Sequence, residues 1–195
     1  FPSLDCISSN TSLVNAEINL VSMVARELQL KEALETISVN YDYIFIDCPP
    51  SLGLLTVNAF AAAKELLIPI QAEYYALEGL GQLVRNVEKI QEFLNPNIFI
   101  STILLTMYDG RLNLSRQVAA DAREYFGTKV FEAVIPRNIR LAEAPSFGKP
   151  ALLHDKESRG ALAYLALAGE MVRRGDAPLP APPSALLSDS APSGA

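Results

Sequence analysis

The sequence contains few of the residues that catalysis and metal binding use most often. His154 is its only histidine, which excludes a catalytic triad or a metal site that needs several histidines. Its two cysteines, Cys6 and Cys48, do not have the spacing of a zinc site or a redox motif. No secretory signal is visible, and charged residues interrupt every apolar run well short of a membrane span. We therefore expect a cytoplasmic protein with no membrane partner.

An excess of positive charge is also missing. The formal net charge is −6, which argues against a protein coated with basic residues for nucleic-acid binding. A local basic face remains possible, because the segment 107–149 holds seven basic and five acidic residues. With 195 residues, half of them hydrophobic, the chain is long enough for one globular domain.

Hydrophobic periodicity predicts helices that alternate with strands. Apolar spacing indicates one or two helices in 12–37 and further helices at 53–63, 76–94, 115–126, 138–144 and 158–174. Buried strands are expected at 41–47, 65–71, 98–109 and 130–135. This rhythm is typical of an α/β fold with a doubly wound, mainly parallel sheet flanked by helices. The Pro/Ala/Ser-rich stretch 175–195 is expected to be a disordered tail.

The segment YDYIFIDCPPSLGLLT, residues 41–56, is the most informative motif. Four apolar residues lead to Asp47, as in a Walker B strand, whose carboxylate orders Mg²⁺ through its water shell beside a nucleotide. Aspartate is also a favoured helix cap and turn residue, so the strand alone is weak evidence. Pro49, Pro50 and Gly53 strengthen it, because a rigid turn after Walker B resembles a nucleotide-sensing switch.

A phosphate-binding loop of the form G-x-x-x-x-G-K-[ST] is absent from the sequence. The only Gly-Lys pair, Gly148-Lys149, precedes a proline and lacks the spacing. The chain also begins at Phe1 rather than methionine. We expect a fragment whose phosphate loop lies upstream, and a chain that by itself neither hydrolyses ATP nor binds it tightly.

Four blocks in order resemble the ParA/Soj chromosome-partitioning ATPases, members of the deviant-Walker P-loop family. They are YDYIFIDCPPSLGLLTVNA, IPIQAEYYALEGLGQL, LLTMYDGRLNLSRQV and VIPRNIRLAEAPSFGKPALLHDKESRGALAYLALAGEM. The resemblance implies that residues 1–174 are the C-terminal portion of such an ATPase domain. In it, the deviant Walker A loop and the first switch would lie before Phe1.

The resemblance also implies a function for the full protein, in chromosome or plasmid partitioning. An ATP-dependent homodimer, with ATP and Mg²⁺ between its subunits, would bind DNA without sequence preference and associate with the nucleoid. A ParB/Spo0J-type centromere-binding partner would stimulate ATP hydrolysis.

The resemblance assigns roles to individual residues as well. Asp47 would be the catalytic Walker B carboxylate that holds Mg²⁺ through water. Pro49, Pro50 and Gly53 would form the second switch, with Pro49 close to the nucleotide. Adenine would lie near Met107, Pro136 and Arg137, and DNA phosphates would contact Arg111 and Arg140. Arg116 and Arg123 are expected to be ordinary helix-surface charges.

Two other functions remain as alternatives. A MinD-like regulator of division-site placement would need a basic amphipathic C-terminal helix, whereas residues 175–195 contain five prolines and no Lys or Arg. The second alternative is a binding module that acts without nucleotide. The upstream coding sequence distinguishes it from an ATPase by the presence or absence of a phosphate loop.

Overall fold

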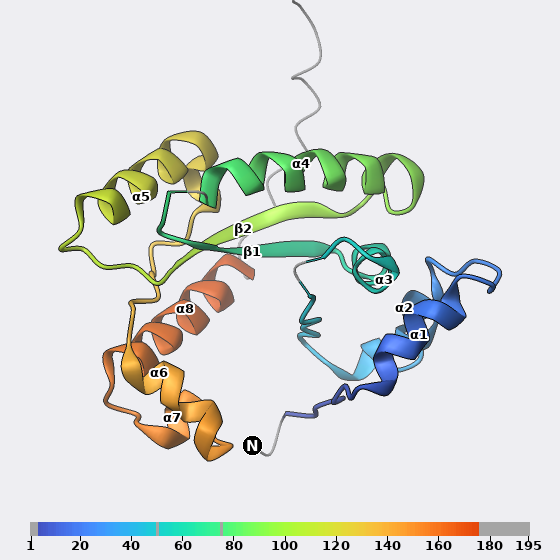
Figure 1. The fold of residues 1–195 in the computed structure, drawn as a ribbon, viewed down its shortest axis with the longest axis horizontal. Coiled ribbons are helices and arrows are strands. Elements are labelled where there is room, and N and C mark those ends of the chain that lie inside the picture. Colours follow the sequence, from blue (N-terminus) through green and yellow to red (C-terminus); the bar gives the residue numbers. More distant parts are fainter. Residues whose placement is uncertain (1–3, 50, 75, 176–195) are drawn as a thin grey trace, which may run out of the picture. The chain divides into compact units, whose positions relative to one another are not determined.

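A computed structural model describes residues 4–49, 51–74 and 76–175 (Figure 1). The chain divides into two compact units, Phe1–Arg137 and Asn138–Ala195, which are described separately below. The predicted tail falls almost entirely outside the described residues, as does Pro50. The prediction of one domain over residues 1–174 therefore stays a prediction.

The first unit contains a parallel pair of strands, β1 (Glu65–Gln71) and β2 (Phe99–Thr106). Helix α4 (Ala76–Phe93) connects them and lies with α5 (Asn113–Phe126) on one face of the pair (Figure 1). Both helices and both strands contribute to one apolar cluster. Its buried members are Ile68, Ile70, Leu80, Ile103, Leu105, Ala119, Ala122 and Val130. The predicted parallel sheet flanked by helices is confirmed.

Helix α4 forms because its apolar residues recur at helical spacing. Leu80, Val87 and Ile90 are all buried, and they occupy one stripe facing the strands. Pro96 cannot continue the helix, which ends at Phe93. The buried side chain of Asn95 donates to the carbonyl oxygens of Phe60 (2.9 Å) and Ala63 (2.7 Å). It thereby satisfies carbonyls at the C-terminal end of the helix Leu54–Ala62.

Among the described residues, three α-helices precede the strands: α1 (Ser12–Leu20), α2 (Gln29–Glu35) and α3 (Leu54–Ala62). Buried Asn58 of α3 accepts a hydrogen bond from the backbone N–H of Leu30 (3.1 Å) and donates to the carbonyl of Arg26 (2.8 Å). These bonds join α2 to α3. The predictions of one or two helices within 12–37 and one over 53–63 are confirmed, with two helices in the first range.

The predicted strand at 41–47 is wrong for this structure. The segment is not assigned to any strand, and its large side chains are exposed, with Phe45 71% accessible. A strand exists through hydrogen bonds to a neighbour, and within the described residues β1 and β2 pair only with each other as full strands. Only Ile46 and Cys48 pack, against a second cluster that contains Ala59 and Phe60.

The predicted strand at 130–135 is also wrong as a continuous element. Its ends follow β2, since Phe131 N–H donates to Ile103 (2.9 Å) and Ile135 N–H donates to Leu105 (2.8 Å). A bend at Glu132 interrupts the ladder between them, so only isolated bridges remain. The strand predicted at 98–109 is shorter than expected, because Met107 turns into the left-handed region at φ 53°.

The described residues of the second unit, 138–175, are mainly helical. They contain α6 (Ile139–Glu143), the 3₁₀ turn η3 (Ala144–Phe147), α7 (Ala151–His154) and α8 (Arg159–Gly175). The predicted helices at 138–144 and 158–174 are confirmed, and α7 is an addition to them. Gly160 lets α8 approach α6, because a Cβ at that position would collide with the side chain of Leu141. No helix in the described ranges has the length and hydropathy of a membrane span.

Candidate functional sites

A pocket of about 540 Å³ lies where β1 and β2 end. It is lined by Ile70, Gln71, Ala72, Glu73, Tyr74, Met107, Leu112, Leu114, Ser115 and Arg137. The carboxyl ends of parallel strands are where α/β proteins bind their ligands. The lining combines apolar side chains with a few polar groups, as is typical of a small-molecule site.

Hydrogen bonds hold the walls of this pocket. Buried Ser115 of α5 donates through Oγ to the carbonyl of Ala72 (3.0 Å), and Ala72 N–H donates to Thr106 (3.0 Å). Arg137 donates its backbone N–H to Tyr108 (3.1 Å), and its guanidinium is 2.9 Å from a carboxylate oxygen of Glu73. The wall on the Arg137 side is therefore joined to the loop after β1.

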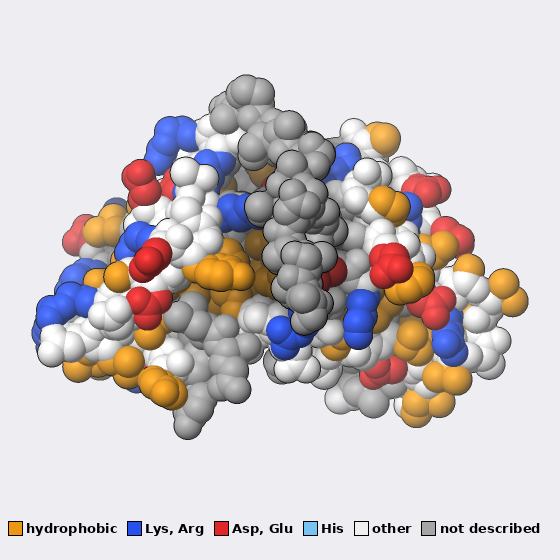
Figure 2. All heavy atoms as spheres, turned by 90° about the horizontal axis from the view of Figure 1, so that it is seen from above, with side chains coloured by type: hydrophobic (Ala, Val, Ile, Leu, Met, Phe, Trp, Pro, Cys, Tyr) orange, Lys and Arg blue, Asp and Glu red, His pale blue; other side chains and the backbone are white. Residues whose placement is uncertain are grey.

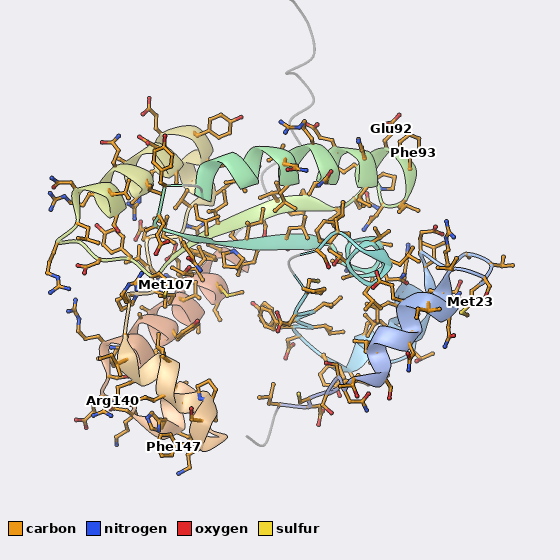
Figure 3. The ribbon with its side chains drawn as sticks, in the orientation of Figure 1. Met23, Glu92, Phe93, Met107, Arg140 and Phe147 are labelled. Atoms are coloured by element: carbon orange, nitrogen blue, oxygen red, sulfur yellow. The ribbon has the colours of Figure 1, made fainter. Side chains whose placement is uncertain are left out.

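Met107, labelled in Figure 3, lines the pocket directly after the end of β2. Its positive φ is unusual for a residue with a side chain and costs free energy that the surrounding structure must supply. The structure thus brings Met107 and Arg137 to one pocket. Pro136 does not line it but is bridged to Tyr108, beside Met107 in the chain. Asp47 and Pro49 do not line it either.

Asp47 lies in the extended segment before α3. Its side chain is exposed, and within the described residues no group of three or more His, Cys, Asp or Glu side chains could hold a metal ion. A single accessible carboxylate suits Mg²⁺ that keeps most of its water and takes its other ligands from phosphate. The residues present fit such an outer-sphere contact and do not form an all-protein metal cage.

The turn after Asp47 leads into α3 through Gly53, the residue before the helix. The carboxylate of Glu17, from α1, accepts the backbone N–H of Leu54 at 2.9 Å. A Cβ on Gly53 would collide with Glu17 Oε1, so the absence of a side chain allows this contact. A carboxylate is favourable at a helix N-terminus, and it holds the end of the candidate switch.

Arg111 lies in the loop between β2 and α5. Its side chain is 89% exposed and forms a bidentate pair with Asp109, at 2.9 Å from Nε and 2.7 Å from Nη2. Asp109 also accepts the backbone N–H of Arg111 (3.1 Å). The guanidinium and this N–H hold the pKa of Asp109 at about 2, and Asp109 in turn raises the pKa of Arg111.

Arg140 belongs to α6 in the second unit and extends outward (Figure 3). Its guanidinium lies 2.9 Å from Glu143 and 3.4 Å from Asp155. The Nε2 of His154 is 3.8 Å from the same Glu143 oxygen, and the His154 ring stacks on Phe147 with centroids 4.7 Å apart. Asn138 caps α6 by accepting the N–H of Leu141 (3.3 Å).

Sequence reasoning misses several partners of these residues. Glu73, Glu17 and Asp109 are absent from the predicted sites, although Asp109 lies two positions before Arg111, the spacing of an Asx turn. The contacts of Glu73 and Glu17 join residues 64 and 37 positions apart. No local sequence pattern predicts a partner at that separation.

Arg116, expected to be an ordinary surface charge, makes specific contacts at the start of α5. Its guanidinium donates to the carbonyl of Gly110 (2.9 Å) and to the side chain of Asn113. It therefore braces the loop that carries Arg111, and both of these acceptors are neutral.

Comparison with known sequences shows close relatives. A family model described as an AAA domain matches residues 1–100. The chain is 54% identical over 172 residues to the sporulation initiation inhibitor protein Soj of Bacillus subtilis, covering 88% of this chain and 68% of that protein. It is 51% identical over 175 residues to the chromosome partitioning protein ParA of Caulobacter vibrioides, covering 89% and 66%.

An uncharacterised Pseudomonas putida protein is 57% identical over 168 residues. That match covers 86% of this chain, and the chain spans 64% of the length of that relative.

Solved structures with the same fold include nucleotide-bound proteins. A cobyrinic acid a,c-diamide synthase from Mycobacterium smegmatis, with bound ADP and magnesium, superposes with TM-score 0.70 at 34% identity, covering 86% of this chain and 61% of that one. The cell division ATPase MinD of Pyrococcus furiosus gives TM-score 0.61 at 27% identity, covering 76% and 59%.

Proposed function

Since this chain belongs to the ParA/Soj family of chromosome-partitioning P-loop ATPases, we propose that it acts in partitioning of a chromosome or plasmid. The active form would be a chain of its relatives' full length, called the full-length protein below. That protein would be an ATP-dependent homodimer that binds DNA without sequence preference and associates with the nucleoid. A ParB-type partner would stimulate its ATP hydrolysis.

The pocket at the ends of β1 and β2 is proposed to hold the adenine base. Supporting this, Met107 and Leu114 offer an apolar wall for a flat ring, and Gln71 and Arg137 offer polar groups at its edge. Pro136 would keep the Arg137 wall in position through its bridge to Tyr108. A relative of the same fold binds ADP and magnesium, which agrees with nucleotide as the ligand.

Asp47 is proposed to position Mg²⁺ through a water ligand. Its carboxylate is exposed and therefore accessible to a hydrated cation. Bound Mg²⁺ would neutralise charge on the phosphates during transfer. Pro49 and Pro50 would limit the backbone freedom of the segment that carries Asp47, and Gly53 would allow the Glu17 contact that ends it.

Arg111 and Arg140 are proposed to contact DNA phosphates. The observation that carries this proposal is the exposure of both side chains, 89% for Arg111 in its loop and 56% for Arg140 on α6. Arginine donates several N–H groups in a fixed geometry that suits phosphate oxygens. Contacts of this kind carry no sequence information, as non-specific binding requires.

Binding to a long random-sequence duplex tests the DNA part. With ATP bound, Arg111→Glu and Arg140→Glu should each lose most of the affinity, and the salt dependence should flatten by about 0.9 for each phosphate that is no longer bound. Sedimentation should show that ATP-dependent dimerisation persists. Parental DNA affinity in both variants would place the DNA surface elsewhere, and loss of dimerisation would make the arginines structural.

Isothermal titration with ATP and Mg²⁺ tests the nucleotide part. The full-length protein should bind, whereas the 195-residue chain should not bind tightly, because its sequence has no loop of backbone N–H groups and lysine to hold phosphates. Micromolar binding by the 195-residue chain would contradict this. A MinD-like function remains the second candidate, supported by the similarity in fold to that ATPase.

A further inference from the structure

The two arginines proposed to bind DNA share a feature that a phosphate-binding residue does not need. Each already has a carboxylate partner within this chain. Arg111 is paired through two nitrogens with Asp109, and Arg140 lies between Glu143 and Asp155. On the face that Figure 2 shows, Lys and Arg side chains are interspersed with Asp and Glu side chains.

The carboxylate, not the arginine, is the fixed member of the Arg111 pair. Asp109 has only 17% of its side chain exposed and also accepts the backbone N–H of Arg111. Arg111 is largely in solvent, and two of its guanidinium nitrogens face Asp109. A phosphate that approaches Arg111 therefore meets an aspartate that is already hydrogen-bonded to the same residue.

The Arg140 pair has the same character on a different element. Glu143 lies one helical turn after Arg140 on α6, so the backbone of the helix keeps the two side chains adjacent. Asp155, which follows α7, approaches the same guanidinium from a second element. Arg116 provides the contrast, because it donates to a carbonyl and an amide, which carry no charge.

We propose that Asp109 and Glu143 act as internal counter-ions that weaken the binding of nucleic-acid phosphates to Arg111 and Arg140. This inference depends on the proposed DNA-binding function. The carboxylates repel the approaching phosphate and compete for the same guanidinium N–H groups. The result is non-specific binding that is weak at each contact.

The salt dependence of binding separates this role from a structural one. When a phosphate binds an uncompensated arginine, it releases a condensed counter-ion. An arginine already neutralised by a carboxylate keeps that local negative charge after the phosphate arrives, which reduces the gain. Removing the carboxylate charge should therefore tighten binding and also steepen its salt dependence. A loop that is merely loosened would not steepen it.

The experiment uses the full-length protein with ATP and a long random-sequence duplex across a potassium chloride series. Asp109→Asn removes the charge and keeps an oxygen that accepts the Arg111 N–H. Glu143→Gln is its equivalent on α6. Each should tighten binding about three- to tenfold, the range expected for removing one charge near a phosphate at the protein surface. Each should also steepen the salt slope by up to about 0.9.

Glu124→Gln is the matched control. Glu124 is an exposed carboxylate on α5, and its position is about 17 Å along that helix from Asn113, beyond the screening length of about 8 Å at physiological salt. Glu124→Gln changes the net charge by the same amount as Asp109→Asn and Glu143→Gln, and it should leave the DNA affinity and the salt slope unchanged. Asp109→Ser provides a second uncharged acceptor, so agreement with Asp109→Asn excludes an effect peculiar to asparagine.

The outcomes separate this inference from the function on which it depends. If Arg111→Glu and Arg140→Glu lose DNA while Asp109→Asn and Glu143→Gln bind like the parent, the counter-ion inference is wrong and the DNA-binding proposal survives. Equal tightening by Glu124→Gln would also overturn the inference, since net charge would explain it. If the arginine variants keep parental affinity, both proposals are wrong.

Discussion

Two segments of this chain have similar sequences and different structures. Residues 43–47 and 99–106 are both rich in apolar residues, and each ends at or shortly before an aspartate, Asp47 or Asp109. The second segment forms β2, with Ile103 fully buried in the cluster that the strands share with α4 and α5. The first is not part of a strand, and Phe45 is mostly exposed.

The difference shows that an apolar run alone does not predict a strand, because a strand also needs a hydrogen-bonded neighbour. β2 is a buried strand because β1 hydrogen-bonds along its edge and α4 and α5 cover its face. Residues 43–47 have no paired strand beside them in the described part of the chain, and only Ile46 and the adjoining Cys48 reach a core. The chemistry at the two ends differs accordingly, since Asp109 is held by its loop and Asp47 is exposed.

The largest expected effect is on stability and compares a buried residue of β2 with an exposed residue of 43–47. In the 195-residue chain, Ile103→Ala should lower the free energy of unfolding by about 2–5 kcal/mol, because it leaves a cavity. Phe45→Ala should change it by less than about 0.5 kcal/mol, as for other exposed sites. Urea unfolding measures both. A large cost at Phe45 in this chain would mean that the segment is buried, contrary to the structure.

Asp47 gives the next effect, in the full-length protein. Asp47→Ala should reduce Mg²⁺-dependent ATP hydrolysis about 100-fold, or about 2.7 kcal/mol of barrier, because the carboxylate orders the metal's water. The thermal unfolding midpoint should not change, since Asp47 is exposed. Phosphate release measures the rate, with Asp47→Asn as the isosteric comparison. Turnover at the parental level would reduce Asp47 to a turn residue.

Met107, at the end of β2, offers a smaller effect with opposite signs in two assays. Met107→Gly removes the side chain from a residue with φ 53° and should stabilise the 195-residue chain by about 0.5–1 kcal/mol. In the full-length protein the same change should weaken ATP binding about threefold, because an apolar wall is removed. Thermal unfolding and titration measure the two. Unchanged ATP affinity would remove Met107 from the adenine site.

The smallest effect concerns acid. The pKa of Asp109 is about 2 in the folded chain and 3.8 ordinarily, so its pair with Arg111 stabilises the fold above about pH 4. That contribution should disappear as the pH falls through about 2. Between pH 4 and pH 2, the free energy of unfolding of the parent should fall slightly more than that of Asp109→Asn. Between pH 5 and pH 8, the difference between the two should stay constant. Urea unfolding at each pH checks this, and parallel curves throughout would contradict it.

Most of the elements could be predicted from the sequence because their signals are local. The stripe of Leu80, Val87 and Ile90 marks α4, and Pro96 marks its end. The motifs after β2 and around the start of α6 pointed to Met107, Arg111, Arg137 and Arg140, by resemblance to partitioning ATPases. The roles of these residues stay predictions. Strand status at 41–47 and 130–135 could not be read from the same signals, because pairing depends on distant segments.

By itself, the sequence determined the family and most of the alternation of helices and strands, since these depend on residue type and spacing along the chain. Resemblance to the family selected Arg111 and Arg140, whereas their exposure depends on the fold. The tertiary structure decided which apolar segments find partners and which charges are compensated. It brought Glu73 to Arg137 and Glu17 to the start of α3, across 64 and 37 residues. The reason is physical: hydrogen bonds and ion pairs act over a few ångströms of space, and the chain must fold before distant residues come that close.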